Sequence, residues 1–279
     1  MLLIIEKITK FMKENFFNLF KTHKPIIAMV HFPALPGSPL YDPKYGLDYI
    51  LESTEKDLLA LQNAGVDAVM FGNENDRPYE FNANLSTTSV MAYIIGQLKN
   101  KISVPFGVNV LWDPISTIAL AVSTDAHFVR EIFTGTYASD MGIWSPDAGK
   151  AMRYRDSLKR NDLLMLYNIS AEFAYSLDRR SIAERSKSVV FSSIPDAILV
   201  SGQITGESVD LSDLKEVKKA IPNIPVLANT GVKIDNVEKT LDITDGVIIG
   251  SSLKVDGNTW NPVDPKRASD FMKKVKIIR

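Results

Sequence analysis

Eight short apolar runs recur along the chain between longer amphipathic segments, and this alternation constrains the fold more than any other feature. The runs cover residues 26–30, 67–71, 105–110, 127–133, 163–168, 196–200, 225–229 and 245–250. Near-continuous apolar runs of this length are typical of parallel strands that helices cover on both faces. Helical patterns are expected at 48–65, 86–100, 145–160, 178–191, 210–221, 234–241 and 264–277. The alternation predicts a single closed (β/α)8 TIM barrel over residues 25–279.

An open, doubly wound α/β sheet is the alternative architecture. Such a sheet normally has fewer strands and a glycine-rich nucleotide-binding turn after the first strand. Here the first run continues into "VHFPALPGSP" (30–39), which is a proline-rich loop and not that turn. Prolines fix their own φ angles, so this loop is expected to be stiff and to hold His31 at the end of the first strand.

Residues 1–24 precede the barrel and are predicted to form an extra N-terminal helix. Apolar residues recur there at helical spacing, at Ile4, Ile8, Phe11, Met12 and Leu19. The apolar stretch at the start is too short for a secretory signal, which needs roughly 7–15 apolar residues, or for a spanning helix, which needs about 20. Two hypotheses stay open: the helix packs on the barrel or on a second subunit, or residues 1–22 contact a membrane surface.

The composition excludes several classes of function. The chain has no cysteine, so disulfides, thiolate zinc sites and thiol nucleophiles are excluded. Lys and Arg number 32 and Asp and Glu 33, and this balance gives no reason to expect nucleic-acid binding. We expect a cytoplasmic protein that forms a homo-oligomer and binds a small molecule.

Polar residues stand at the carboxyl ends of successive predicted strands, where barrels build their active sites. They are His31 after the first strand, Asn73 and Glu74 after the second, Asn109 on the third, Arg130 and Glu131 on the fourth, Asn168 on the fifth, and Ser201 and Gly202 after the sixth. Buried polar groups are costly unless they are hydrogen-bonded or used. The pattern therefore predicts a functional site at this end of the barrel.

Chemistry divides these residues into two groups. His31, Glu74, Glu131 and Asp140 are the candidate catalytic acids and bases, since a histidine or a desolvated carboxyl can exchange protons near neutral pH. Asp140 belongs to the long loop 133–149, which is expected to be a lid or a binding loop.

The second group is expected to bind substrate. It comprises Asn73, Asn109, Arg130, Asn168, Ser201 and Gly202. Two structural alternatives stay open. Arg130 and Glu131 would instead form an ion pair at the rim, and the loop after the sixth strand would instead be flexible, with Asp210 capping the next helix.

The last two strands end in sequences suited to binding an anion. "ANTGV" (228–232) and "GVIIGSSLK" (246–254) supply glycines, whose backbone N–H groups can approach phosphate oxygens, and small hydroxyl side chains. Barrels often bind phosphate with these two loops. The predicted phosphate-binding residues are Asn229, Thr230, Gly231, Gly250, Ser251 and Ser252. The alternative is ordinary turn and helix-cap chemistry.

No cofactor is predicted from these residues. A divalent metal held by His31 and carboxylates is a lesser alternative, because no close His/Asp spacing supports it. No lysine ends strands four to six, which argues against a Schiff-base aldolase.

With these residues in view, the chain resembles the BtpA/SgcQ family. The matching blocks are 29–42, 64–79, 105–113, 128–142, 198–206, 226–232 and 246–257. "REIFTG" (130–135) and "SDMGIW" (139–144) resemble the SgcQ branch more than the cyanobacterial branch. The resemblance implies a (β/α)8 barrel. One branch is associated with photosystem I accumulation and the other with a carbohydrate gene region, and neither association assigns catalytic residues.

Two functions are therefore expected as alternatives. The first is an isomerase or lyase that acts on a phosphorylated sugar or a similar small phosphorylated metabolite by acid/base chemistry. The second is a biogenesis or stability factor for a membrane protein complex that has no catalytic activity. The first is favoured, because a scaffold has little use for so polar a barrel mouth.

Overall fold

Eight parallel strands close into a barrel in the computed structural model, which describes residues 13–279. The order around the barrel is β1-β11-β10-β9-β7-β4-β3-β2, and every neighbouring pair is parallel. The strands are β1 (Ile26–His31), β2 (Ala68–Gly72), β3 (Phe106–Asn109), β4 (Phe128–Glu131), β7 (Leu164–Asn168), β9 (Ala197–Val200), β10 (Val226–Ala228) and β11 (Gly246–Ile249). The predicted (β/α)8 TIM barrel is confirmed.

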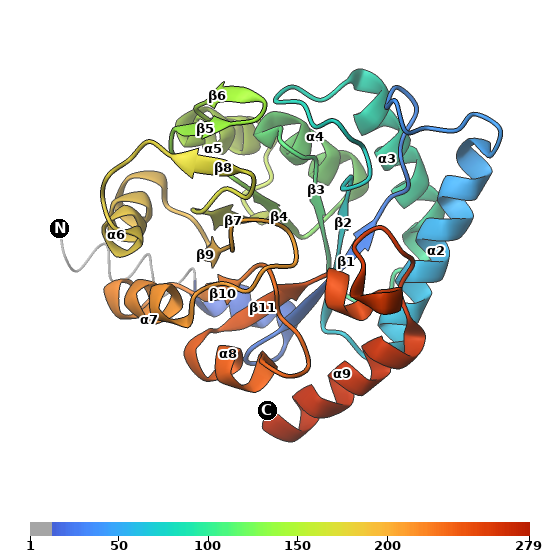
Figure 1. Cartoon of the computed structure of the whole chain (residues 1–279). Coiled ribbons are helices and arrows are strands. Elements are labelled where there is room, and N and C mark those ends of the chain that lie inside the picture. The colour runs from blue at the N-terminus through green and yellow to red at the C-terminus, as the bar shows by residue number, and fades with distance from the viewer. Residues whose placement is uncertain (1–12) are drawn as a thin grey trace.

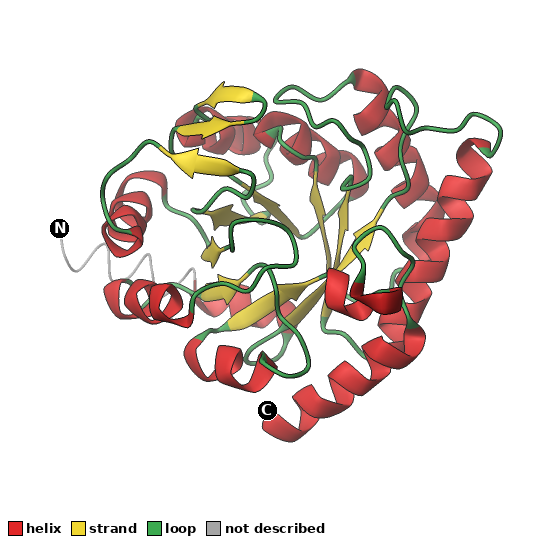
Figure 2. Cartoon of the chain, in the orientation of Figure 1, coloured by secondary structure: helices red, strands yellow, loops and turns green. Residues whose placement is uncertain are grey.

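One helix follows each barrel strand and lies on the outside of the barrel (Figures 1 and 2). The helices are α2 (Gly46–Ala64), α3 (Leu85–Leu98), α4 (Pro114–Thr124), α5 (Ala148–Ser157), α6 (Ile182–Ser193), α7 (Leu211–Ala220), α8 (Val237–Ile243) and α9 (Pro265–Ile278). Side-chain caps define several of their starts. Asp210 accepts a hydrogen bond from the Ser212 amide at the start of α7, as the sequence suggested.

The helix α4 was missed from the sequence. Its residues, "PISTIALAVST", are mostly apolar or β-branched, and they show no clear polar face on which a helical period could be recognised. Asp113 and Pro114 at its start are the signal that could have found it. The Asp113 side chain accepts from the amides of Ile115 and Ser116, and proline is favoured at the first helical position.

A small antiparallel sheet stands at the mouth of the barrel and was also not predicted. The loop 133–149 contains β5 (Tyr137–Ser139) and β6 (Gly142–Trp144), which form a hairpin. The strand β8 (Ala174–Ser176) pairs with the other side of β5, so β5 is the central strand of the sheet. Figure 1 shows this sheet above α5. The side chain of Trp144 is buried there and stacks on Phe81, so it covers apolar surface.

Residues 13–20 form a helix that closes the bottom of the barrel. Phe16 and Phe20 are buried and pack with residues from inside the barrel, including Ile27, Phe128 and Leu227. This contact fits the hypothesis that the N-terminal segment packs on the barrel. Residues 1–12, which carry most of the expected apolar spacing, lie outside the described part of the chain. From residue 13 onward, no helix is long and apolar enough to cross a membrane.

Candidate functional site

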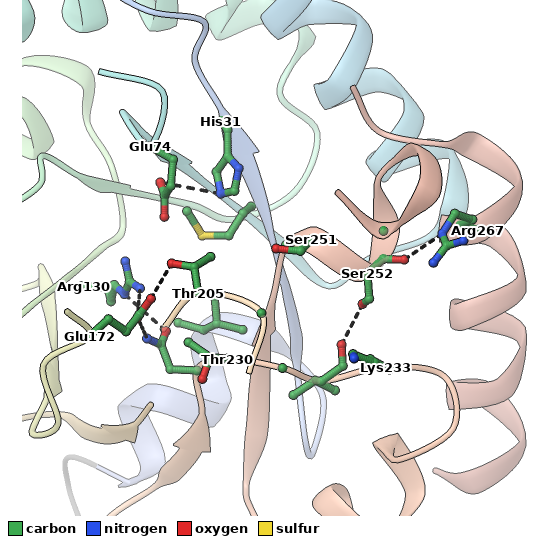
Figure 3. A pocket seen from close by; sticks show the side chains of 18 of the residues that line it. His31, Glu74, Arg130, Glu172, Thr205, Thr230, Lys233, Ser251, Ser252 and Arg267 are labelled. Carbon is green, nitrogen blue, oxygen red and sulfur yellow. Dashed lines mark hydrogen bonds and ion pairs between the residues drawn. The ribbon is translucent and has the colours of Figure 1, made fainter. Parts of the chain in front are cut away.

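A cavity of about 260 Å³ opens at the carboxyl ends of the barrel strands (Figure 3). Its walls come from β1, from the ends of β2, β4, β10 and β11, and from the loops after β7 and β9. The polar residues that line it are His31, Glu74, Arg130, Glu172, Thr205, Asn229, Thr230, Lys233, Ser251, Ser252, Asp256 and Arg267. The cavity therefore lies where the sequence predicted the site.

His31 and Glu74 face each other at one wall of this cavity. His31 Nε2 lies 3.6 Å from Glu74 Oε2, which is too long for a hydrogen bond. Both side chains are buried, and among residues 13–279 neither ring nitrogen of His31 nor Oε2 of Glu74 has a hydrogen-bond partner. Buried polar atoms are rarely left without partners, so this pair has unused hydrogen-bonding capacity at the cavity wall.

Burial shifts both groups toward their neutral forms. It holds the pKa of His31 well below its usual value, and the nearby charges of Lys254 and Arg130 lower it further. Burial raises the pKa of Glu74 to about 7, against the opposing charge of Arg130. At neutral pH the imidazole is therefore uncharged, and the carboxyl group is close to its midpoint of protonation.

The loop after β11 reaches the same cavity as His31. A Cβ added to Gly250 would lie 3.3 Å from His31 Cε1, so even one methyl group would press on the imidazole. His31 and the segment Gly250–Ser252 thus line one cavity, which is the geometry on which the predicted site depends.

The loops after β10 and β11 are tied together. Ser252 Oγ donates to the Val232 carbonyl at 2.7 Å, and Arg267 Nε donates to the Ser252 carbonyl at 3.0 Å (Figure 3). Within residues 13–279, the amides of Gly231, Ser251 and Ser252 donate no hydrogen bond to the protein. Lys233 and Arg267 add positive charge where these loops line the cavity.

Arg130 is held at the wall of the cavity by a buried network. Its Nη1 donates to Asn109 Oδ1 at 2.7 Å, and its Nε donates to Asn229 Oδ1 at 3.2 Å. Its Nη2 lies 3.5 Å from Glu172 Oε1, and Thr205 Oγ1 donates to the other oxygen of Glu172 at 2.7 Å. Arg130 therefore pairs with Glu172. The ion pair with Glu131, which the sequence left open as an alternative, is not formed among the described residues.

Glu131 lies behind this network and does not line the main cavity. One of its carboxyl oxygens accepts from Asn109 Nδ2 and the other from the Ile132 amide. It lines a narrow adjoining hollow instead, together with Tyr79 and Trp112. Burial outweighs these hydrogen bonds and raises its pKa to about 8. Its contacts are those of a residue that positions Asn109 and, through Asn109, Arg130.

Asp140 lies apart from the cavity. It is exposed in the turn between β5 and β6, and it is absent from the cavity wall. Its place at the tip of a hairpin depends on the small sheet, which the sequence did not reveal.

The remaining predicted substrate-binding residues support the cavity from below or beside it. Asn73 Oδ1 accepts from the Leu111 amide at 2.8 Å. Asn168 Nδ2 and Asn229 Nδ2 both donate to Ser201 Oγ, at 2.9 and 2.7 Å. The Gly202 amide donates to Thr230 Oγ1 at 2.6 Å. Of these residues only Asn229 and Thr230 reach the cavity wall.

Several cavity residues were missed from the sequence or placed wrongly. Glu172 lies in the loop four residues beyond the end of β7, and Arg267 lies on α9. The sequence alone does not place either residue at the mouth of the barrel, because their positions depend on the path of a loop and of a helix. Lys254, close to the predicted phosphate loop, does not line the cavity. The structure buries it and places its Nζ 3.6 Å from Asp57 Oδ2.

No group of three or more His, Asp or Glu side chains that could hold a metal ion occurs in the part of the chain from residue 13 to 279. The divalent metal, a lesser alternative from the sequence, stays untested.

Similar proteins have been described in bacteria and archaea. The chain is 47% identical to the sgc region protein SgcQ of Escherichia coli (strain K12), over 92% of this chain and 96% of that protein. It is 31% identical to the photosystem I biogenesis protein BtpA of Synechocystis, over 92% of this chain and 90% of that protein.

Solved structures share the fold at low sequence identity. Phosphoribosyl anthranilate isomerase from Thermus thermophilus superposes with a TM-score of 0.55 at 10% identity, covering 91% of this chain and all (100%) of that chain. Dihydropteroate synthase from Xanthomonas albilineans gives a TM-score of 0.56 at 11% identity, covering 91% of this chain and 92% of that chain. Likeness at this level supports the barrel fold alone. The BtpA family model, by contrast, matches residues 22–277, and the chain is therefore a member of the BtpA family.

Proposed function

We propose that this chain is an enzyme that binds a phosphorylated sugar or a similar small phosphorylated metabolite and isomerises or cleaves it by proton transfer. The observation that carries the proposal is the pair of His31 and Glu74. Their buried polar atoms lack protein partners, and they share a cavity with two loops suited to binding an anion.

The pair has the properties that acid/base catalysis needs. A neutral imidazole can accept a proton, and a carboxyl group with a pKa of about 7 can donate or accept one at neutral pH. One group would remove a proton from a carbon or hydroxyl next to a carbonyl, while the other protonates an oxygen. Arg130 would stabilise negative charge that develops on oxygen. Both isomerisation and carbon–carbon cleavage of sugar phosphates use such steps.

The phosphate group would bind at the loops after β10 and β11. The amides of Gly231, Ser251 and Ser252 are available as donors, and Lys233 and Arg267 supply positive charge. The scissile or rearranging part of the substrate would then extend toward His31 and Glu74, since His31 lies next to the loop after β11.

The first test is binding followed by proton exchange. A sugar phosphate at about 100 times its Kd should stabilise the fold by ~2.7 kcal/mol, which thermal melting detects, and its unphosphorylated parent should not. The compound is then incubated with the protein in D2O, and deuterium incorporation is followed by NMR. We expect His31→Asn and Glu74→Gln to slow exchange by a factor of about 100 or more while binding persists.

Asp140→Asn is the matched control, because Asp140 is exposed and does not line the cavity. It should exchange protons at the wild-type rate. If no phosphorylated compound raises the melting temperature, or if both cavity variants exchange normally, the proposal is wrong.

A binding role without catalysis is the second candidate, favoured by the name of the Synechocystis relative. It predicts that the full-length chain sediments with lipid vesicles through residues 1–22. Deleting that segment would also remove Phe16 and Phe20 from the barrel core. The better variants are therefore Ile4→Asp and Ile8→Asp, which should abolish sedimentation if this second role is correct.

A further inference from the structure

A second hollow of about 750 Å³ lies beside the cavity, between the N-terminal half of α2 and the segment that precedes α9. Residues from the loops after β1 and β2, from α2 and from 254–262 line it, and they include Tyr41, Asp42, Tyr45, Tyr49, Glu52, Asn75 and Trp260. We call this hollow the α2 groove. His31 lines both the cavity and the α2 groove, so the two hollows meet at the candidate catalytic histidine.

Half-exposed aromatic rings make up much of the groove. Tyr45 is 55% exposed, Tyr49 49% and Trp260 46%, and the rings of Tyr45 and Tyr49 lie 5.3 Å apart. The guanidinium of Arg77 lies 3.7 Å from the centre of the Trp260 ring and helps to fix that ring. Aromatic faces with a few polar groups nearby are the usual wall of a small-molecule site.

The polar groups of the groove favour an uncharged ligand with hydroxyl groups. Lys254 is paired with Asp57, and Lys56 offsets part of the charge of Asp42 and Glu52, so the groove has little net charge to attract a second phosphate. Asp42 and Glu52 can accept hydrogen bonds from hydroxyls, and Lys56 can donate them. The C–H faces of a sugar ring pack on aromatic rings such as Tyr49 and Trp260. The groove therefore has the donors, acceptors and apolar faces that suit a sugar ring.

The groove walls are fixed before any ligand binds. Lys254 Nζ donates to the Asn261 carbonyl at 3.0 Å and lies 3.6 Å from Asp57 of α2. Asp57 also accepts from the Val263 amide at 2.8 Å. These contacts tie the 254–263 segment to α2, and a wall that is already ordered loses little entropy when a ligand binds.

The volumes of the cavity and of the α2 groove also favour a ligand with more than one ring. Small-molecule pockets usually measure about 300–1,000 Å³. The cavity, at about 260 Å³, falls just below that range, whereas the α2 groove, at about 750 Å³, lies within it. A ligand that fills both would be larger than a single sugar phosphate.

We propose that the substrate is a phosphorylated sugar carrying a second, uncharged sugar ring, with its phosphate in the cavity, its second ring in the α2 groove, and the reacting part beside His31. This inference rests on the proposed function, since it assumes that the cavity binds the phosphate.

The test compares ligands that differ by one ring. Isothermal titration would measure glucose 6-phosphate against trehalose 6-phosphate, sucrose 6-phosphate and maltose 6′-phosphate. At least one two-ring compound should bind about tenfold more tightly than glucose 6-phosphate, which corresponds to ~1.4 kcal/mol. Tyr49→Ala, which removes an aromatic wall, and Ser53→Tyr, which fills the groove, should abolish this advantage and leave glucose 6-phosphate binding unchanged.

Tyr93→Ala is the matched control, because Tyr93 is also 49% exposed but lies on α3, outside both hollows. It should keep the full advantage of the two-ring compound. If glucose 6-phosphate binds but no two-ring compound binds more tightly, the inference is overturned and the proposed function stands. If none of the four compounds binds, the inference is overturned, and the wider melting screen decides the proposed function separately. If Tyr49→Ala changes the oligomeric state in sedimentation instead of the ligand preference, a second copy of the chain covers the groove and the inference is wrong.

Discussion

At the scale of single residues, the site depends on buried groups whose charge is set by their surroundings. His31 and Glu74 lie 3.6 Å apart, and burial favours the neutral form of each. Arg130 supplies a fixed positive charge in the same cavity. A site of this kind changes its net charge near neutral pH through Glu74, because that group has a pKa of about 7.

This charge change predicts the pH dependence of anion binding. Sulfate does not titrate near neutral pH, so it reports only on the protein. As the pH falls through about 7, Glu74 gains a proton and the cavity loses a negative charge, so sulfate should bind more tightly. Glu74→Gln should flatten this dependence in isothermal titration, whereas the exposed-helix control Glu216→Gln should not. A Glu74→Gln protein that keeps the full dependence would refute the assignment.

The raised pKa of Glu131 predicts how the stability of the fold depends on pH. Its folded-state pKa of about 8 is raised above the ordinary value of 4.5, so the folded state binds this proton more tightly than the unfolded state. The resulting stabilisation is complete below about pH 4.5 and is lost as the pH rises through about 8. In urea titrations across this window, Glu131→Gln should lose less stability with rising pH than the wild type. Equal slopes for the two proteins would show that Glu131 is not held protonated.

At the scale of elements, the two loops predicted to bind phosphate are shaped by close contact with their neighbours. Gly231 has φ +64°, and a Cβ there would lie 2.2 Å from the backbone of Glu207 and Ser208. The loop after β9 therefore packs directly on the loop after β10. The glycine that the sequence suggested for an anion is also required by this packing.

Gly231→Ala should accordingly destabilise the fold by at least ~1 kcal/mol, through strain at the positive φ and the clash with the neighbouring loop. Gly96→Ala is the control, because Gly96 lies inside α3 and a Cβ there meets nothing within 4 Å. It should stabilise the protein by ~0.5–1 kcal/mol. The midpoints of urea unfolding curves measure the stability change in each of the two variants. A Gly231→Ala protein as stable as the wild type would contradict the packing described here.

The elements also show what sequence patterns can predict. Strands that are buried on both faces consist of nearly continuous apolar residues, so the sequence predicted all eight barrel strands and the polar residues at their ends. The helix α4 and the strands β5, β6 and β8 lack a clear period and were missed. Glu172 and Arg267 reach the cavity only because of where a loop and a distant helix run, which no local pattern encodes.

At the scale of the whole molecule, the barrel is closed at one end and opens into the candidate site at the other. The helix at residues 13–20 places Phe16 and Phe20 against the inner residues of the barrel, on the side opposite the candidate site. The barrel interior is thus filled from below, and the cavity is confined to the carboxyl ends of the strands.

Phe16 should therefore contribute strongly to stability. Phe16→Ala should lower the free energy of unfolding by ~3–5 kcal/mol, the usual cost of removing a buried aromatic ring. Asn18 is exposed on the same helix, and Asn18→Ala should change it by no more than ~0.5 kcal/mol. Urea denaturation compares them. Equal, small effects would mean that the helix does not close the barrel in solution.

The central claim is that one cavity binds a phosphate group at the loops after β10 and β11 and presents the rest of the ligand to His31 and Glu74. A crystal structure with whichever sugar phosphate raises the melting temperature most tests it directly. Phosphate oxygens should lie within about 2.7–3.2 Å of the amide nitrogens of Gly231 and Ser251. A phosphate bound outside this cavity, with His31 and Glu74 untouched by the ligand, would contradict it.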